Sequence, residues 1–367
     1  MKNKKHLILI VITIALCMLF AGLQFYKYTN NWQYETYVKA IAFSPDGRMI
    51  LTVENGVEMF LWCVESGKEK KRLAKPYHGG GADHIAFGPH GKKAVTGGTD
   101  GVILWDIERG RMIRVFEESF PSRSRIKGPV VAFSPDGQMI LSCDAGELIR
   151  VWDTQSGKLL IELNDNGIYD NGESNPDSSI MSVDLSPDGR FALTCGENLK
   201  LWDIHSGQKI RSFIGHKKTI LAAVFSSDGR QVISGSQDKT FKVWSVETGR
   251  QLESIANDLF PTVISFSHDG NYALTGSFDG SIKLWDIKGG RSIRSFPQNG
   301  MDELLSLSFS PDMNKVVSGC IFKENDKSRT GCLLLMDLQT GEIVRKFKRK
   351  FSLTRILMDI VWDYVKI

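Results

Sequence analysis

The sequence lacks the residue patterns that most enzymes and metal sites need. Its six cysteines include no CxxC pair and no cysteine–histidine cluster at metal-ligand spacing. It contains no Walker phosphate-binding loop and no HExxH metalloprotease motif. No paired carboxylates stand in a recognisable catalytic context. We therefore expect no catalytic site, no bound metal and no cofactor.

The chain also lacks a strong charge of either sign. Its formal net charge is +4, and three positive charges belong to Lys2, Lys4 and Lys5, which leaves 4 − 3 = +1 for the rest. Nucleic-acid surfaces are usually far more basic. We expect no nucleic-acid partner.

One long run has no charge at all. Residues 7–23 (LILIVITIALCMLFAGL) follow MKNKKH, and a transmembrane helix needs about 20 apolar residues. This predicts a cytoplasmic N-terminus at 1–6, a signal anchor at 7–26 and a globular domain on the extracytoplasmic side, because the lysines precede the helix. The alternative is a cleaved signal peptide and a secreted or periplasmic domain. Leu16 before Cys17 argues against a lipoprotein, which has a small residue there.

Most of the remaining chain repeats one unit seven times. Each unit has an apolar run ending in FSPDG or a variant, at 43–47, 87–91, 133–137, 185–189, 225–229, 266–270 and 309–313. A second strand, a turn and a strand ending in LWD or a variant follow each time. Six of the eight tryptophans occupy this one position: Trp62, Trp105, Trp152, Trp202, Trp244 and Trp285, with Met336 in the seventh unit.

A second turn of the ESGK type and a short final strand complete each unit. Pro, Asp, Ser and Gly favour tight turns at both places, so four antiparallel strands per unit are expected. The repeat positions lie 40 to 52 residues apart, and so small a sheet cannot bury its faces alone. We predict an all-β, seven-bladed β-propeller.

In these motifs the chain resembles the WD-repeat (WD40) β-propeller family, from about residue 36 to 347 within a domain at 32–347. The resemblance implies a buried hydrogen-bonded tetrad of His, Ser or Thr, Asp and Trp in a blade. The full set is His216, Ser234, Asp238 and Trp244 in blade five and His78, Thr96, Asp100 and Trp105 in blade two; blade six keeps Thr275, Asp279 and Trp285 but has Asn257 for His. The other blades are expected to depend more on apolar packing.

A Ser/His/Asp set could also be a hydrolase triad. A nucleophile needs exposure beside an oxyanion hole, and the sequence has no GxSxG motif. A structural tetrad, in which each polar group is satisfied while buried, is the favoured interpretation.

Three longer loops are expected on one face of the propeller, at 117–129, 164–179 and 321–331. Long loops in compact folds are often functional. Candidate partner-binding residues there are Arg123, Arg125, Lys127, Tyr169, Asp170, Lys323 and Arg329. The acidic residues of the second loop are interpreted as solvated turn formers rather than calcium ligands. Arginines on the fourth strands, at 114, 211, 294 and 345, are interpreted as edge protection.

The C-terminal residues 348–367 have apolar side chains at helical spacing and predict a short amphipathic tail helix. Packing on the propeller is favoured over the bilayer surface, because Asp359 and Asp363 oppose attraction to anionic lipid. Cys320 and Cys332 flank one loop and are close enough in sequence to meet, but a disulfide would need an oxidising compartment.

The expected function is that of a membrane-tethered scaffold that binds a protein or peptide partner through the loop-rich face. Two alternatives remain open: an exported propeller enzyme or small-ligand receptor that uses the central funnel, and a purely structural subunit of an envelope complex. Neither the partner nor the oligomeric state follows from the sequence.

Overall fold

The structure is a computed structural model that describes residues 37–55, 58–73, 81–99, 101–117, 129–143, 148–164, 180–258, 260–277, 279–296, 301–325 and 328–347. Within these ranges, no helix has the length and apolar character needed to cross a membrane. The expected anchor at 7–26 and the expected tail helix at 348–367 lie outside the described residues.

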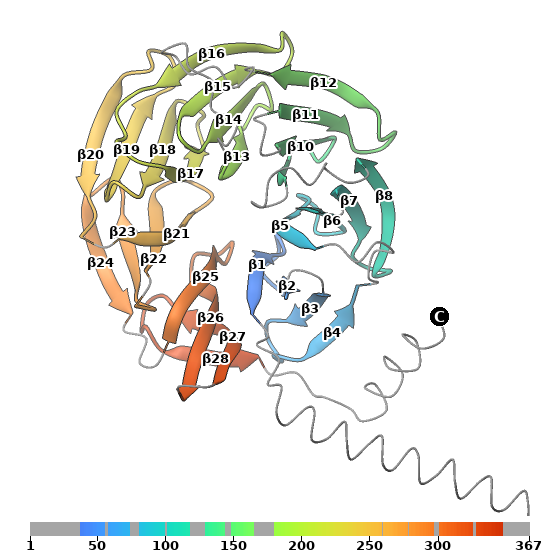
Figure 1. Ribbon diagram of the computed structural model, residues 1–367, viewed down its shortest axis with the longest axis vertical. Helices are drawn as coiled ribbons and strands as arrows, with labels where there is room; N and C mark the ends of the chain where they lie inside the picture. Colours follow the sequence, from blue (N-terminus) through green and yellow to red (C-terminus); the bar gives the residue numbers. More distant parts are fainter. Residues whose placement is uncertain are drawn as a thin grey trace, which may run out of the picture.

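Seven four-stranded antiparallel sheets form a ring around a central axis, which confirms the seven-bladed propeller (Figure 1). Blade one comprises β1 (Val38–Phe43), β2 (Met49–Glu54), β3 (Glu58–Cys63) and β4 (Glu69–Arg72). Blade two comprises β5 (Ala82–Phe87), β6 (Lys93–Gly98), β7 (Gly101–Asp106) and β8 (Arg111–Glu117). Blade three comprises β9 (Val130–Phe133), β10 (Met139–Cys143), β11 (Leu148–Asp153) and β12 (Leu159–Asn164). Blade four comprises β13 (Ser182–Leu185), β14 (Phe191–Cys195), β15 (Leu199–Asp203) and β16 (Gln208–Phe213).

The remaining blades follow the same order. Blade five comprises β17 (Ile220–Phe225), β18 (Gln231–Ser236), β19 (Thr240–Ser245) and β20 (Gln251–Ala256). Blade six comprises β21 (Pro261–Phe266), β22 (Tyr272–Ser277), β23 (Ile282–Asp286) and β24 (Arg291–Phe296). Blade seven comprises β25 (Met301–Phe309), β26 (Lys315–Asn325), β27 (Ser328–Asp337) and β28 (Ile343–Phe347). The first strand of each blade lines the axis and the fourth lies at the rim (Figure 1).

The FSPDG motif forms the turn between the first two strands of a blade. In blade one, Ser44 Oγ donates to Asp46 Oδ1 (2.5 Å) and accepts from the Met49 amide (2.9 Å), while Asp46 accepts from the Arg48 amide. The same serine–aspartate bond recurs in blades three to seven. Each bond satisfies polar groups that the sharp reversal removes from water.

The core lies between blades rather than within them. Trp105 and Ile103 of blade two share one buried cluster with Leu51, Val53 and Leu61 of blade one. A single four-stranded sheet has two apolar faces and no interior of its own, so each face is buried only against a neighbouring blade. This makes closure of the ring a condition for stability.

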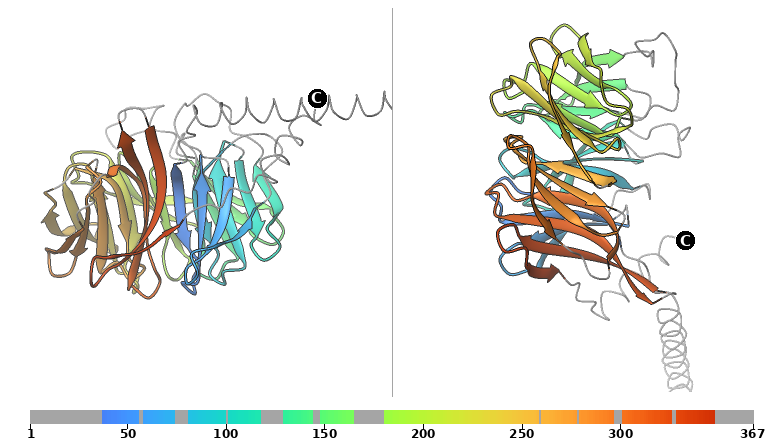
Figure 2. Two further views of the ribbon diagram at one scale, coloured as in Figure 1. Left: turned by 90° about the horizontal axis from the view of Figure 1, so that it is seen from below. Right: turned by 90° about the vertical axis from the view of Figure 1, so that its left-hand side faces the viewer.

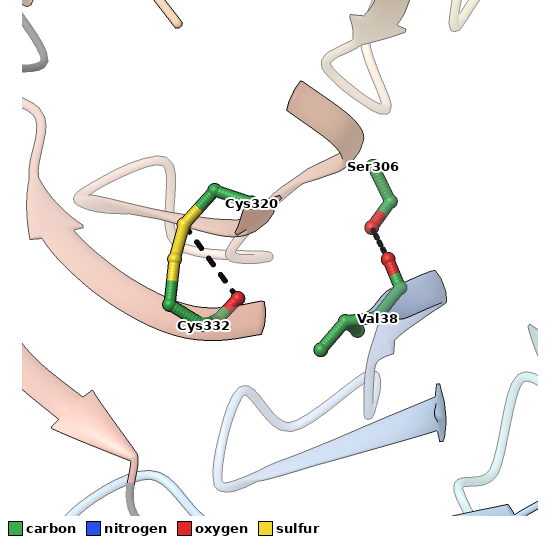
Figure 3. Close-up of a disulfide and its surroundings, with 4 residues drawn as sticks. All are labelled: Val38, Ser306, Cys320 and Cys332. Carbon is green, nitrogen blue, oxygen red and sulfur yellow. Dashed lines mark hydrogen bonds between the residues drawn. A yellow bond between two sulfur atoms is a disulfide. The ribbon is translucent and has the colours of Figure 1, made fainter. Parts of the chain in front are cut away.

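The ring closes between blades seven and one by packing and hydrogen bonds. Ser306 Oγ donates to the Val38 carbonyl oxygen (3.2 Å), which joins the inner strands β25 and β1 (Figure 3). The rings of Trp62 and Phe347 meet edge to face at 5.7 Å near the outer strands. In the described residues, the four strands of each of these blades are contiguous in sequence, so no strand is exchanged between them.

Arginines of three fourth strands, in blades two, six and seven, each link their blade to the next, a role that the interpretation as edge protection missed. Arg114 of blade two donates to the Ser156 carbonyl in the turn of blade three, and Arg294 of blade six to the Thr340 carbonyl of blade seven (3.2 Å). Arg345 completes the series at the closure, where it donates to Ser66 of blade one. At two of these boundaries a turn glycine leaves room for the long side chain: a Cβ on Gly157 would clash with Arg114, and one on Gly67 would clash with Arg345.

Candidate interaction face

The antiparallel order of the strands gives the propeller two unlike faces. The FSPDG turns and the ESGK-type turns lie at one end of the blades, which we call the turn face. The connections between second and third strands, and those between successive blades, lie at the opposite end, which we call the loop face. Its described connections include 214–219 and 237–239, and residues 257, 258 and 260 of the connection between blades five and six. All three expected long loops connect strand ends on the loop face.

The structure brings the four predicted side chains of blade five together at this face. Trp244 Nε1 donates to Ser234 Oγ (2.8 Å), and Ser234 Oγ lies 2.8 Å from His216 Nε2. His216 Nδ1 lies 2.9 Å from Asp238 Oδ2. With the imidazole proton on Nδ1, the hydroxyl donates to Nε2 and the imidazole donates to the carboxylate. Every polar side-chain group of this four-residue network then has a hydrogen-bond partner.

The aspartate also fixes the backbone of the loop face. Asp238 accepts from the Lys217 amide (2.8 Å), the Thr240 amide (3.0 Å) and the Thr240 hydroxyl (2.6 Å). Burial opposes ionisation of Asp238, but these hydrogen bonds and the one from His216 together lower its pKa. Desolvation lowers the pKa of His216, so the imidazole is neutral.

This arrangement is unsuited to nucleophilic catalysis. The Ser234 side chain is fully buried and the His216 side chain is 2% exposed, so no substrate can reach the hydroxyl. The Ser234 hydroxyl is also bonded to the indole and the imidazole at once. The geometry is that of a buried structural network.

Blades two and six share part of this arrangement. Trp105 donates to Thr96 (2.9 Å), whereas His78 and Asp100 lie outside the described residues. In blade six Trp285 donates to Thr275 (3.0 Å), and Asp279 accepts from the amide and hydroxyl of Ser281, as Asp238 does from Thr240.

The blades that were expected to depend more on apolar packing still keep one bond of the tetrad. The indole-to-hydroxyl bond also forms in blades one, three and four, at 2.9–3.0 Å. The tryptophan and the hydroxyl residue face each other across adjacent strands, so this bond needs neither His nor Asp. Blade seven alone has Met336 in place of tryptophan, and the buried Ser318 hydroxyl has no hydrogen-bond partner among the described residues.

The predicted partner-binding residues are placed only in part. Arg123, Arg125, Lys127, Tyr169 and Asp170 lie outside the described residues. The expected loop at 321–331 is instead mostly a strand extension, with Lys323 paired opposite Arg329 in the β26–β27 ladder. The residue types in this segment did not indicate the strand extension, because the ladder is extended by backbone hydrogen bonds. The hairpin rises beyond the body of the ring on the loop face (Figure 2).

A disulfide joins the two strands at the base of this hairpin. Cys320 of β26 and Cys332 of β27 are directly opposite in register, with Cα atoms 5.1 Å apart (Figure 3). This separation is within the usual range for a disulfide. The bond lies where the hairpin leaves the buried core, since Cys320 is fully buried and Cys332 is partly exposed.

The sequence reasoning missed a second group on the loop face, between blades five and six. Phe260 is 55% exposed. The Lys239 ammonium lies 3.9 Å and the Lys218 ammonium 5.3 Å from the centre of its ring. The available signal was Lys239 itself, which follows the tetrad aspartate where blades two and six have Gly101 and Gly280.

An aspartate on the inner strand of blade four was also missed. Asp184 Oδ2 accepts from the amide of Phe225 in blade five (2.8 Å), and burial raises the pKa of this carboxyl to about 6.

On the turn face, a cavity of about 440 Å³ between blades five and six is lined in part by Asp228, Asp269 and Lys288. Within the part of the chain that the structure describes, no group of His, Cys, Asp or Glu is arranged to hold a metal ion.

Comparison with known proteins assigns the repeats. Four segments match the model of the WD domain, G-beta repeat, at residues 129–153, 172–203, 207–245 and 258–286. The chain is 26% identical over 239 residues to the Periodic tryptophan protein 2 homolog of Dictyostelium discoideum, which covers 60% of this chain and 24% of that protein. It is 29% identical over 223 residues to the WD repeat-containing protein 26 homolog of Arabidopsis thaliana, in an alignment that covers 58% of this chain and 34% of that protein.

A third relative is the WD repeat-containing protein WDS homolog of Arabidopsis thaliana, 25% identical over 232 residues, covering 60% of this chain and 40% of that protein. The chain thus spans less than half the length of each of these curated relatives. What the chain shares with these relatives is the WD repeat.

Proposed function

We propose that this chain, a β-propeller with WD40 repeats, is a membrane-tethered scaffold that binds a protein partner through its loop face. The observation that carries the proposal is the asymmetry between the two faces. The turn face repeats short, internally bonded turns, whereas the loop face has the two long connections between blades, the projecting β26–β27 hairpin and an exposed aromatic ring under two lysines.

The buried tetrad supports a binding role. It fixes the connections 214–219 and 237–239 to the body of blade five, so their exposed side chains are presented from a rigid base. Preorganised loops lose little conformational entropy when they bind a partner.

Tethering and export rest on the uncharged segment at 7–26, with the Cys320–Cys332 disulfide as support. Disulfides form and persist mainly in oxidising compartments. In an exported domain, the Cys320 and Cys332 thiols would be oxidised to this disulfide in such a compartment. Its other described cysteines, at 63, 143 and 195, form no disulfide.

Two experiments test the proposal. After carbonate extraction of membranes, the intact chain should remain in the pellet with residues 7–26 present; a soluble product starting near residue 22 would refute the anchor. Thiol alkylation before and after reduction should show Cys320 and Cys332 protected until reduction, whereas free thiols in freshly isolated chain would argue against an oxidising location.

Partner binding is tested by charge reversal. Replacement of Arg123, Arg125 and Lys127 by glutamate should abolish co-purification of a partner without lowering the melting temperature. Substitution of Lys68 and Lys158 by glutamate on the turn face is the control and should leave co-purification unchanged. Equal loss in both variants would refute the assignment to the loop face.

A further inference from the structure

The described part of the loop face has one sector in which an aromatic ring and several cations converge. Phe260 ends the connection between blades five and six, Lys239 lies between β18 and β19, and Lys217 and Lys218 lie between blades four and five. We call Lys217, Lys218, Lys239 and Phe260 the cationic aromatic patch. Three separate connections of the fold supply it.

The patch is held rigidly by the backbone beneath it. The Lys217 amide donates to the tetrad residue Asp238, which fixes the start of the lysine pair. The Asn257 amide donates to the Lys239 carbonyl (2.7 Å), which joins the connection that contains Phe260 to the turn that contains Lys239. The relative positions of ring and ammonium groups therefore depend on buried bonds rather than on the lysines alone.

Lys239 occupies a backbone conformation that disfavours lysine. Its φ is +65°, in the left-handed region, and the corresponding residue of blade six is Gly280, with φ of +75°. A side chain with a Cβ pays a steric penalty there that glycine avoids. The fold would be more stable with glycine at 239, so the lysine is retained at a cost, as side chains with a functional role often are.

The lysines of the patch form no ion pair within the described part of the chain, although Lys239 adds to the effect of Lys283 in lowering the pKa of Asp258. The Asp238 carboxylate is buried and bonded to His216, and Asp258 pairs with Lys283. Among the described residues, no carboxylate lies within ion-pair distance of Lys217, Lys218 or Lys239. An exposed ring with the Lys239 and Lys218 ammonium groups over its face, and with exposed Lys217 on the same connection as Lys218, is complementary to a ligand with carboxylates next to an apolar group.

We propose that the cationic aromatic patch binds an acidic linear peptide of the partner, with one apolar side chain against Phe260 and flanking carboxylates on Lys217, Lys218 and Lys239. This inference rests on the proposed function and specifies the partner chemistry for one sector of the loop face. An anionic lipid surface is the weaker fit, because its continuous negative charge would also face the exposed Asp258 carboxylate, whereas a peptide can place its carboxylates on the lysines and away from Asp258.

The test uses the full chain in zwitterionic phosphatidylcholine nanodiscs and a fluorescein-labelled twelve-residue probe, EEFEEFEEFEEF. The wild type should bind it in a salt-dependent manner and should not bind the same peptide with lysine for glutamate. The double variant K218E/K239E and the variant F260S should each weaken binding at least tenfold. The matched turn-face variant K68E/K158E should bind as the wild type does.

Lys239→Gly separates function from folding. It should raise the melting temperature, because it relieves the left-handed conformation, and yet weaken probe binding several-fold. Equal binding by wild type and K218E/K239E would overturn the patch, as would preference for phosphatidylglycerol vesicles over the probe. If co-purification of a partner still depends on Arg123, Arg125 and Lys127 in that case, the proposed function stands and only the patch fails.

Discussion

The guanidinium of Arg345 in blade seven donates to the carbonyl of Ser66 in blade one, at 3.2 Å, and to that of Glu65, at 2.7 Å. Arg345 and Ser66 are separated by 279 positions in the chain, and their contact joins the last described strand to the first blade. At the other six boundaries the polypeptide itself links the blades. Closure depends on contacts of this kind, together with the packing of Trp62 on Phe347.

Arg345→Ala should therefore loosen the closure more than an equivalent change elsewhere. We expect a loss of about 1 kcal/mol from the hydrogen bonds themselves, and faster amide hydrogen exchange in β1 and β28. Arg114→Ala removes the same link between blades two and three, where the chain is continuous, and is the control. Indistinguishable exchange in the two variants would show that Arg345 has no special role in closure.

Removal of the tetrad histidine or aspartate should destabilise blade five. His216→Ala or Asp238→Ala leaves buried partners unpaired, at a cost of about 1–3 kcal/mol in the free energy of unfolding. Asp238→Asn is the sharper variant, because it keeps the shape and changes the acceptor. Chemical denaturation followed by tryptophan fluorescence measures the effect, and an unchanged midpoint for Asp238→Asn would remove the tetrad assignment.

The buried serines of blades five and seven should respond in opposite directions. Ser234 accepts from Trp244, so Ser234→Ala should cost about 1–3 kcal/mol. Ser318 occupies the same repeat position beside Met336 and has no partner among the described residues, so Ser318→Ala should be neutral or stabilising. Thermal denaturation of the two variants checks the contrast, and a large loss for Ser318→Ala would contradict it.

Asp184 should make stability fall as the pH rises. Burial raises the pKa of its carboxyl from 3.8 to about 6, so between about pH 4 and 6 the native chain binds more protons than the unfolded chain. The stability that Asp184 contributes is complete below pH 4 and is lost as the pH rises through 6. Asp184→Asn keeps an acceptor for the Phe225 amide and cannot ionise.

The stability of Asp184→Asn relative to the wild type should thus increase from pH 4 to pH 7 by about 2–3 kcal/mol, seen as a growing difference between their melting temperatures. Asp188→Asn is the control of opposite sign. The hydrogen bond from Ser186 lowers the pKa of Asp188, so this group stabilises the fold above its unfolded pKa and the effect is lost on acidification. A difference for Asp184→Asn that does not vary with pH would refute the assignment.

The sequence by itself determined the blade count, the strand order and the hydroxyl partners of Trp105, Trp244 and Trp285. These features repeat at fixed spacing, and each depends on local chemistry: turn residues in FSPDG, alternation in the strands, and an indole opposite a hydroxyl on the adjacent strand. His216, Ser234, Asp238 and Trp244 could be chosen in advance for the same reason, since one blade contains them all.

Only the tertiary structure decided what happens between blades. The role of Arg345 depends on a turn 279 residues away, and the meeting of Lys239, Lys218 and Phe260 depends on three connections from neighbouring blades. No periodicity within a repeat encodes such contacts. They arise because the blades pack radially and close a ring, which places side chains from distant parts of the chain against one another.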